Sequence, residues 1–476
     1  MTAALASLEI SPEGWATAHD GLVESLRDLI RIPSINPPDP AGPELDAARY
    51  LAGALRDSGI PATVHEPIDG RGSVTARLRG DGSGGDPLLL LSHLDVVPAP
   101  TDGWTHDPFA GDVADGYVYG RGAVDMKNLV AMQLEVMRIL AAEARAAGRD
   151  PASDPVPGLR RDVLFASTAD EEAGGLAGAG WLSFEHPEEL QAAAAINEAG
   201  AVAVHVGERR LYPIQVAEKG TTVYRLTFRG AWGHGSMPRP DNAILLAAEA
   251  VTRLAEPAPV RLTPVTRRFL EGAIAATDGP AARALTALAS GESGATSAAL
   301  AGVCSPVYAR ALDAMLRDTL SATVLHGGVK YNVIPGLAYL EIDVRRLPGT
   351  SEDDAEARIQ ELLGPDLAAV TDVELLIGTD AVVADFETTG GLYPILESVI
   401  REHDPGAIPL PVMAPFSTDA KHLLGLGVPT FGFSPLRQPP GETYLDRYHG
   451  VDERVSLEGL RWGLPVLYDA VRRFCG

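Results

Sequence analysis

The sequence contains few of the features that mark secreted, membrane or nucleic-acid-binding proteins, beginning with cysteine. Its 476 residues include two cysteines, Cys304 and Cys475, too few and too far apart for a disulfide framework or a thiolate metal motif. No apolar run approaches the roughly 18 residues that would span a membrane. Residues 1–11 lack the basic start and apolar core of a secretory signal. We therefore expect free thiols, no membrane partner and a cytoplasmic protein.

Positive charge is also scarce. The chain has 39 basic against 64 acidic residues, a formal net charge of -25. Binding to nucleic acid through its phosphates requires the opposite excess, so we expect no nucleic-acid partner. The glycine-rich segment 80–86 is not followed by a helix start and therefore does not predict a phosphate-binding loop. The remaining composition, 46% hydrophobic and 22% charged, is typical of a globular protein of two or three domains.

Histidine and acidic residues form four clusters, which mostly follow short apolar runs. The clusters are Ser92-His93-Leu94-Asp95, Gly122-Ala123-Val124-Asp125, Asp170-Glu171-Glu172 and Asn197-Glu198. An apolar run that stops at ionisable residues is typical of a buried parallel strand, and ligands of open α/β sheets bind at the carboxyl ends of such strands. One imidazole with several carboxylates is a donor set that suits zinc, manganese or cobalt. The clusters together predict a metal site.

Each cluster alone also has a simpler explanation. His93 and Asp95 could be an ordinary hydrogen-bonded pair, Asp125 could cap the helix that follows it, and Glu171 and Glu172 could lie on the surface. In a metal site, Asp95 would orient the imidazole of His93 from behind. One of the adjacent glutamates would bind metal and the other would move a proton, which would offset the cost of their like charges.

Hydrophobic periodicity indicates an α/β domain interrupted by a second domain. Helical spacing in 15–30 and 44–57 precedes strand patterns near 73–79 and 87–92, and a long helix is predicted over 128–147. Strand patterns at 221–229, 321–328 and 336–345 predict a sheet with helices on a single face. We expect a catalytic domain in two parts, 1–217 and 381–476, around an inserted α+β domain, 218–380. The inserted domain would include an Ala- and Leu-rich helical segment at 265–318.

Motifs along nearly the whole chain resemble one enzyme family. Besides the four clusters, they are Gly233-His234-Gly235-Ser236-Met237-Pro238, Tyr331-Asn332-Val333-Ile334-Pro335, Asp343-Val344-Arg345, Ser417-Thr418-Asp419-Ala420, Gly432-Phe433-Ser434-Pro435 and His449-Gly450-Val451-Asp452-Glu453-Arg454. The chain is similar to the dizinc metallopeptidases and amidohydrolases that include aminoacylases, carboxypeptidase S, acetylornithine deacetylase and succinyl-diaminopimelate desuccinylase. The later motifs are most similar to the carboxypeptidase S and aminoacylase branch.

This resemblance implies a cofactor and its ligands. The family's catalytic domain has a central, mostly parallel sheet, and its inserted α+β domain acts as a lid and dimerisation domain. The cofactor would be two divalent cations, with zinc expected and cobalt or manganese as alternatives. The implied ligands are His93, Asp125 and Glu198 for one cation, and Glu172, Asp125 and His449 for the other, with Asp125 bridging both.

The resemblance also implies roles for further residues. Glu171 would be the general base that takes a proton from the metal-bridging water and passes it to the leaving amine. His234 would stabilise the oxyanion, in some relatives from a partner subunit, which implies a homodimer. Arg345 and Asn332 would hold the substrate carboxylate, and the backbone at Gly432 would approach the substrate. An ion pair on the strand surface is the alternative for Arg345.

These roles predict a hydrolase that cleaves the amide of an N-acyl amino acid or short peptide with a free carboxylate, without a covalent intermediate. One alternative is a biosynthetic deacylase or desuccinylase. Another is an inactive protein that binds amino-acid conjugates, which the presence of Glu171 and all five ligands opposes. The extra helices of 265–318 could stand in for a partner's lid, extend a dimer contact or narrow the substrate entrance.

Overall fold

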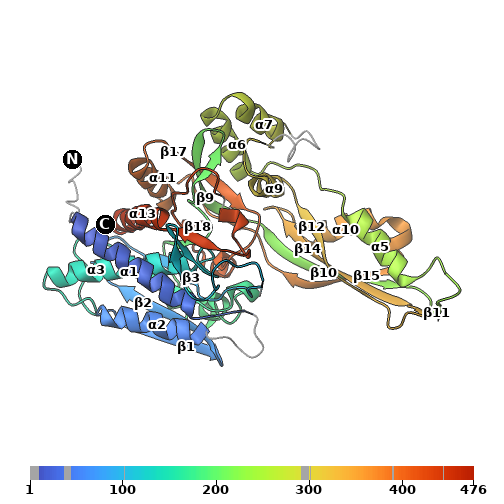
Figure 1. Ribbon diagram of the computed structural model, residues 1–476, viewed down its shortest axis with the longest axis horizontal. Coiled ribbons are helices and arrows are strands. Elements are labelled where there is room, and N and C mark those ends of the chain that lie inside the picture. The colour runs from blue at the N-terminus through green and yellow to red at the C-terminus, as the bar shows by residue number, and fades with distance from the viewer. Residues whose placement is uncertain are drawn as a thin grey trace.

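The chain forms a large and a small β-sheet. The computed structural model describes residues 10–36, 44–100, 102–290, 300, 302–388, 391–442 and 444–476. Residues 1–9, on which most of the signal-peptide expectation rests, lie outside this range, as do 291–299 and 301 of the predicted helical segment. In Figure 1 most helices surround the large sheet, and the small sheet extends to one side of it.

The large sheet is parallel in its centre and antiparallel toward its edges. Its order is β1 (Ala62–Ile68), β2 (Arg71–Leu78), β6 (Val163–Thr168), β3 (Leu88–His93), β7 (Ala194–Asn197), β18 (Thr430–Gly432), β9 (Arg209–Glu218) and β16 (Val382–Val383), and β8 (Val204–Val206) and β17 (Ala407–Ala414) also pair with β9. Strands β6, β3, β7 and β18 are mutually parallel, as is β17 with β9; the other pairs are antiparallel. The α/β class is thus confirmed, with a mixed sheet.

Helices cover both faces of the large sheet. Leu88 and Leu90 of β3 belong to the apolar core on one face, and Leu89 and Leu91 to the core on the other. This is why the run at 87–91 shows no polar alternation. The first face is covered by α1 (Pro12–Arg31), α2 (Glu44–Asp57), α3 (Lys127–Ala146), α11 (Leu392–His403) and α13 (Leu457–Cys475), and the second by α4 (Ala179–Glu185) and α12 (Ala420–Leu423). No helix among the described residues has the length and apolarity to cross a membrane.

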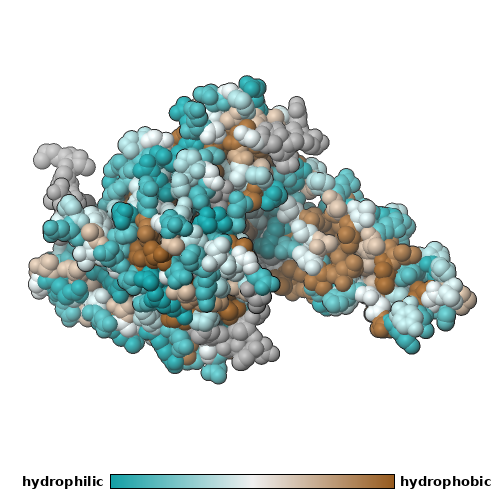
Figure 2. Space-filling model, in the orientation of Figure 1, coloured by the Kyte–Doolittle hydropathy of each residue, from teal (hydrophilic) through white to brown (hydrophobic). Residues whose placement is uncertain are grey.

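A second unit, which we call the small-sheet unit, consists of four antiparallel strands and two helices. The strand order is β12 (Thr319–Gly327), β14 (Leu337–Arg346), β10 (Gly220–Arg229) and β15 (Thr371–Gly378), and α5 (Ala243–Leu254) and α10 (Glu352–Ala368) pack on one face. The single helical face predicted from sequence is confirmed. The other face exposes Leu337 and Ile377, and its connections expose Trp232, Val329 and Tyr331. Figure 2 shows extensive brown, hydrophobic surface on this unit.

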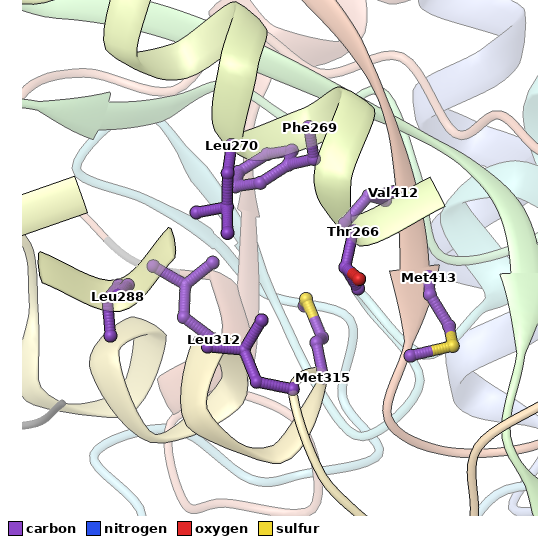
Figure 3. Close-up of a pocket in the computed structure, with 9 residues that line it drawn as sticks. Thr266, Phe269, Leu270, Leu288, Leu312, Met315, Val412 and Met413 are labelled. Atoms are coloured by element: carbon purple, nitrogen blue, oxygen red, sulfur yellow. The ribbon is translucent and has the colours of Figure 1, made fainter. Parts of the chain in front are cut away.

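The helices of the Ala- and Leu-rich segment lie apart from the small sheet. They are α6 (Pro264–Ala276), α7 (Gly279–Ala289) and α9 (Pro306–Ala314). We expected them to enlarge the inserted domain, but α6 packs against β17 and β9, α7 packs against α6, and all three helices share the core of the large sheet. Figure 3 shows Leu270, Leu312 and Met315 gathered beside Val412 and Met413 of β17. The domain limits at 218 and 380 stay a prediction.

Candidate metal centre

Five side chains predicted as metal ligands converge where the central parallel strands end. His93 is the last residue of β3, Glu172 follows β6 in a short 3-10 turn, and Glu198 follows β7 directly. Asp125 lies just before α3, and His449 precedes β19 (Arg454–Ser456). The α3 helix has no side-chain N-cap, so Asp125 does not have the capping role that its position also suggested.

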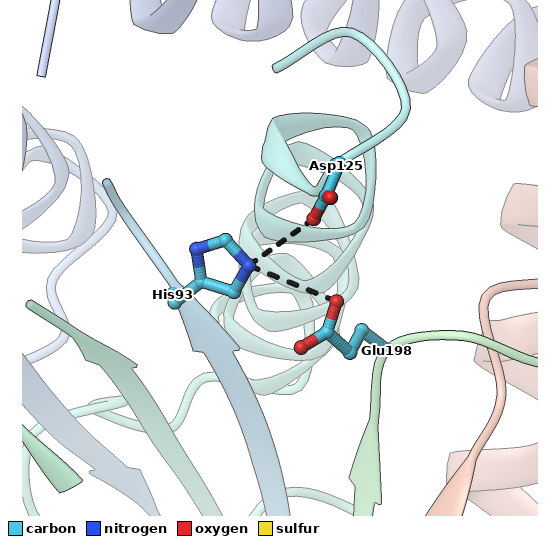
Figure 4. Close-up of side chains that lie close together, drawn as sticks. All are labelled: His93, Asp125 and Glu198. Carbon is cyan, nitrogen blue, oxygen red and sulfur yellow. Dashed lines mark ion pairs between the residues drawn. The ribbon is translucent and has the colours of Figure 1, made fainter. Parts of the chain in front are cut away.

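The donor atoms form two groups that share Asp125, and Figure 4 shows the group of His93, Asp125 and Glu198. Nε2 of His93 lies 3.3 Å from Oδ1 of Asp125 and 3.7 Å from Oε2 of Glu198. Nε2 of His449 lies 3.3 Å from Oδ2 of Asp125 and 3.4 Å from Oε2 of Glu172. Each oxygen of the Asp125 carboxylate thus faces a different group.

These separations fit metal coordination better than hydrogen bonding. Hydrogen bonds between nitrogen and oxygen usually measure about 2.7–3.2 Å. Two donors that each lie about 2.0–2.1 Å from a tetrahedral zinc ion are roughly 3.3 Å apart. Nε2 of His93 and Oε1 of Glu172 are buried and have no hydrogen-bond partner in the described part of the chain. The residues present therefore fit a site for two divalent cations.

The pKa values of the cluster show that bound cations would replace protons. Burial, together with the nearby carboxylates, raises the pKa of Glu198 to about 8 against the opposing effect of His93, and burial with the nearby Asp125 raises that of Glu172 to about 7. The adjacent carboxylates of Asp125 and Glu172 raise the pKa of His449 to about 10. Burial disfavours a charged His93, but Glu198 and Asp125 outweigh this effect and raise its pKa well above the ordinary value. Without cations, protons partly compensate the carboxylates.

Asp95 holds His93 and the two adjacent glutamates in place. Nδ1 of His93 lies 3.0 Å from the Asp95 carbonyl oxygen and 3.4 Å from its carboxylate, which directs Nε2 toward Asp125. The same carboxylate accepts hydrogen bonds from the backbone N–H groups of Glu171 and Glu172, at 3.1 and 2.9 Å. The His-X-Asp spacing therefore serves both the imidazole and the turn after β6.

Glu171 lies beside the two groups and next to a buried lysine. Its Oε1 is 3.5 Å from Nζ of Lys421, whose side chain is 9% exposed. Burial raises the pKa of Glu171, and the positive charge of Lys421 opposes this rise. A carboxyl whose pKa is raised toward neutrality is suited to take up and release a proton.

The other predicted site residues lie elsewhere. His234 and Asn332 are neighbours at one end of the small-sheet unit, where β11 (Gly233–His234) pairs with β13 (Val333–Ile334), far from β3 and β18 in Figure 1. The guanidinium of Arg345 donates to both carboxylate oxygens of Asp343, at 2.7 and 2.9 Å, which is the ion pair named as its alternative. Gly432 is buried in β18, against the backbone of Glu198.

Three supporting residues had no predicted role. Oε1 of Glu453 accepts hydrogen bonds from the N–H groups of Val124 and Asp125, and Oε2 accepts one from Arg121 at 2.6 Å, which fixes the loop before α3. Asn36 donates to Asp95 at 2.8 Å, and Lys421 lies near Glu171. The motif at 449–454 contains Glu453, but only the fold brings it next to Asp125.

Comparison with known proteins assigns this chain to a protein family. The model of peptidase family M20/M25/M40 matches residues 89–473. The chain belongs to this family. It is 28% identical over 399 residues to probable carboxypeptidase S-like 2 of Dictyostelium discoideum, covering 81% of this chain and 71% of that protein. It is 25% identical over 422 residues to the N-fatty-acyl-amino acid synthase/hydrolase PM20D1 of Bos taurus, covering 86% and 78%.

A solved structure has the same fold. The M20 family metallo-carboxypeptidase Sso-CP2 of Sulfolobus solfataricus aligns with a TM-score of 0.70 at 15% identity, over 95% of this chain and 99% of that one. The M20/M25/M40 membership confirms the predicted family, and with it a metal-dependent hydrolase of the peptidase and aminoacylase type.

Proposed function

We propose that this M20/M25/M40 member hydrolyses the amide bond of an N-acyl amino acid or short peptide that has a free carboxylate. The observation that supports this most is the pair of donor groups around Asp125, at separations of 3.3 to 3.7 Å, with Glu171 beside them. The similarity to carboxypeptidase S-like and N-acyl-amino-acid-hydrolysing proteins supports the substrate class.

In this proposal the five ligands hold two divalent cations, with zinc expected. His93, Asp125 and Glu198 hold one, and Asp125, Glu172 and His449 hold the other. When bound, the cations act as Lewis acids that polarise the amide carbonyl and lower the pKa of water. Asp95 keeps the Nε2 atom of His93 free for its ligand role, because it occupies the Nδ1 side of the ring.

Glu171 is the proposed general base and then the general acid. Its carboxylate accepts a proton from the attacking water and delivers it to the nitrogen of the leaving amine. Lys421, 3.5 Å away, keeps the carboxylate in place between these two steps. Direct attack by water leaves no covalent link between the enzyme and the acyl group.

The small-sheet unit is the proposed lid. His234 would stabilise the oxyanion, and Asn332 and Arg345 would bind the substrate carboxylate, after this unit closes or a partner subunit supplies His234. Arg345 would then exchange Asp343 for the substrate, since one guanidinium fork holds one carboxylate at a time. Free cysteines support the proposed cytoplasmic location.

The decisive experiment compares wild type with Glu171→Gln after chelation and zinc readdition, on a panel of N-acyl amino acids and dipeptides. We expect two zinc ions per chain in both proteins and a kcat lower by about 10²–10⁴ in Glu171→Gln. Glu188→Gln, at an exposed glutamate, should behave like wild type. Zinc binding without hydrolysis of any panel member would refute the proposed activity and favour the inactive binding protein.

A further inference from the structure

A narrow cavity opens beside the metal centre, between the extra helices and the large sheet. Its lining includes Ala199, which follows Glu198 directly, and Phe416 and Tyr444, whose rings both contact Tyr448, the residue before His449. Tyr308, Ala311 and Met315, on or just after α9, form the opposite wall. This cavity therefore begins one residue away from Glu198 and is separated from His449 by the ring of Tyr448.

A second cavity lies deeper and is apolar. Phe269, Leu270, Leu288 and Leu312 line it from the helical segment, with almost no polar surface. Met315, Val412 and Met413 line both cavities, so these three side chains form the partition between them. Residues of α9 and β17 line both cavities, and Figure 3 shows the second one.

The partition consists largely of flexible side chains. The free volume is about 30 Å³ in the first cavity and about 10 Å³ in the second, so both are narrow in this structure. Methionine has an unbranched side chain that adapts its shape to a ligand. Movement of Met315 and Met413 would join the cavities into one slot.

The first cavity also contains buried polar atoms. Oη of Tyr308 and Oε1 of Gln215 have no hydrogen-bond partner among the described residues, and both residues are more than nine-tenths buried. Buried polar groups are normally paired, so this wall is suited to a ligand with polar atoms at one end. The polar end of such a ligand would lie toward Ala199, and its apolar end would lie beyond Met315 in the second cavity.

We propose that this slot binds the acyl chain of the substrate, and that the chain is long, linear and apolar. This inference rests on the proposed function, in which the amide lies at the metal centre and the carboxylate is held by the small-sheet unit. With those two parts of the substrate placed, the acyl group is the remaining part, and it would lie against the large sheet. From Tyr308 to Met315 the slot follows α9 for ~10 Å, longer than an amino-acid side chain.

The length of the slot sets the chain length. An extended chain of about eight to ten carbons spans this distance, with C–C bonds of about 1.5 Å. Each methylene group moved from water into the slot should increase kcat/KM up to about fourfold. The helices of 264–314 would thus determine substrate specificity.

The test measures kcat/KM for N-acetyl, N-hexanoyl and N-decanoyl derivatives of one amino acid. For wild type we expect a decanoyl-to-acetyl ratio of at least a hundredfold. Ala311→Leu narrows the first cavity and Met315→Phe fills the partition, and each should lower this ratio at least tenfold. Ala287→Leu, on α7 outside both linings, should keep the wild-type ratio. Thermal melts identify any variant that fails to fold, in which case the other variant decides.

A second measurement separates the slot from the activity. Calorimetric titration of the chelated, metal-free protein with decanoate should show binding with a negative heat-capacity change, and both cavity variants should weaken it at least tenfold. If no acyl amino acid is cleaved but decanoate binds in this way, the proposed function fails and the slot stands. Hydrolysis with equal ratios in wild type and both variants would overturn the slot and leave the function intact.

Discussion

Among single residues, Asp95 connects the largest number of site components. It contacts the His93 ring and accepts a hydrogen bond from the side chain of Asn36. Its carboxylate also accepts hydrogen bonds from the backbone N–H groups of the turn that holds Glu171 and Glu172. In Asp95→Asn, an amide N–H₂ would replace one acceptor oxygen, so the turn and the imidazole would lose their common anchor. We expect zinc affinity to fall about 10- to 100-fold, measured by competition with a chromogenic chelator.

A second histidine–aspartate pair provides the control. Nδ1 of His106 lies 3.2 Å from Oδ2 of Asp112, away from the metal centre. Asp112→Asn should leave zinc affinity unchanged. An equal loss in both variants would mean that Asp95 acts through general stability.

Lys219 predicts a dependence of stability on pH. Its Nζ donates to the carbonyl groups of Ala314 and Arg317 and to Thr319, and burial lowers its pKa to about 7. Between about pH 7 and 10 the unfolded chain binds a proton that the folded protein does not. The free energy of unfolding should therefore rise with pH, by up to about 1.4 kcal/mol per unit.

Urea denaturation between pH 7 and 9.5 measures this slope. We expect Lys219→Met to have a flatter profile than wild type, whereas Lys330→Met, at an exposed lysine, should retain the wild-type slope. Identical slopes in wild type and Lys219→Met would contradict the lowered pKa.

At the scale of elements, the close approach of β18 to β7 depends on Gly432. A Cβ atom at this position would lie 2.3 Å from the Glu198 carbonyl oxygen and 2.6 Å from the Cβ of Gln215. Gly432→Ala should therefore displace Glu198, lower the free energy of unfolding by about 1–3 kcal/mol and weaken zinc binding. Gly425→Ala, where nothing lies within 4 Å, is the matched control in calorimetric melts and zinc titrations. Unchanged zinc affinity in Gly432→Ala would show that the strands adjust without moving the ligand.

The sequence predicts most elements but not all of their partners. The runs that end at His93, Glu171 and Glu198 are recognisable because burial on both faces removes polar alternation. Strand β9 is harder to recognise, since Pro213 lies within it and proline disfavours a central strand. The periodicity of 264–314 shows that one face of each helix is buried, but not that β17, some 100 residues later, covers it. The structure places His234 far from the metal centre, and the closure or partner that we propose to bring it there is not specified by local sequence.

At the scale of the whole molecule, the open face of the small-sheet unit predicts a homodimer. Ile377 is 53% exposed on the edge strand β15, and its pairing with Val223 places it on the face opposite α5 and α10. Exposed apolar patches of this kind mark interaction sites. We expect wild type to sediment as a dimer and Ile377→Asp to sediment as a monomer. Ile68→Asp, on the edge strand β1 of the large sheet, should remain dimeric. A monomeric wild type at micromolar concentration would refute this prediction.

The position of β18 has a consequence for biosynthesis. This strand comes from residues 430–432, yet it lies inside the large sheet between β7 and β9. His449 and Glu453 also come from this late part of the chain. A nascent polypeptide therefore leaves β7 and β9 unpaired on these sides until residues 430–432 have emerged from the ribosome. The proposed metal site is complete only after His449 has been translated, so metal binding should follow that step, and chaperones that shield strand edges should bind before β18 is in place.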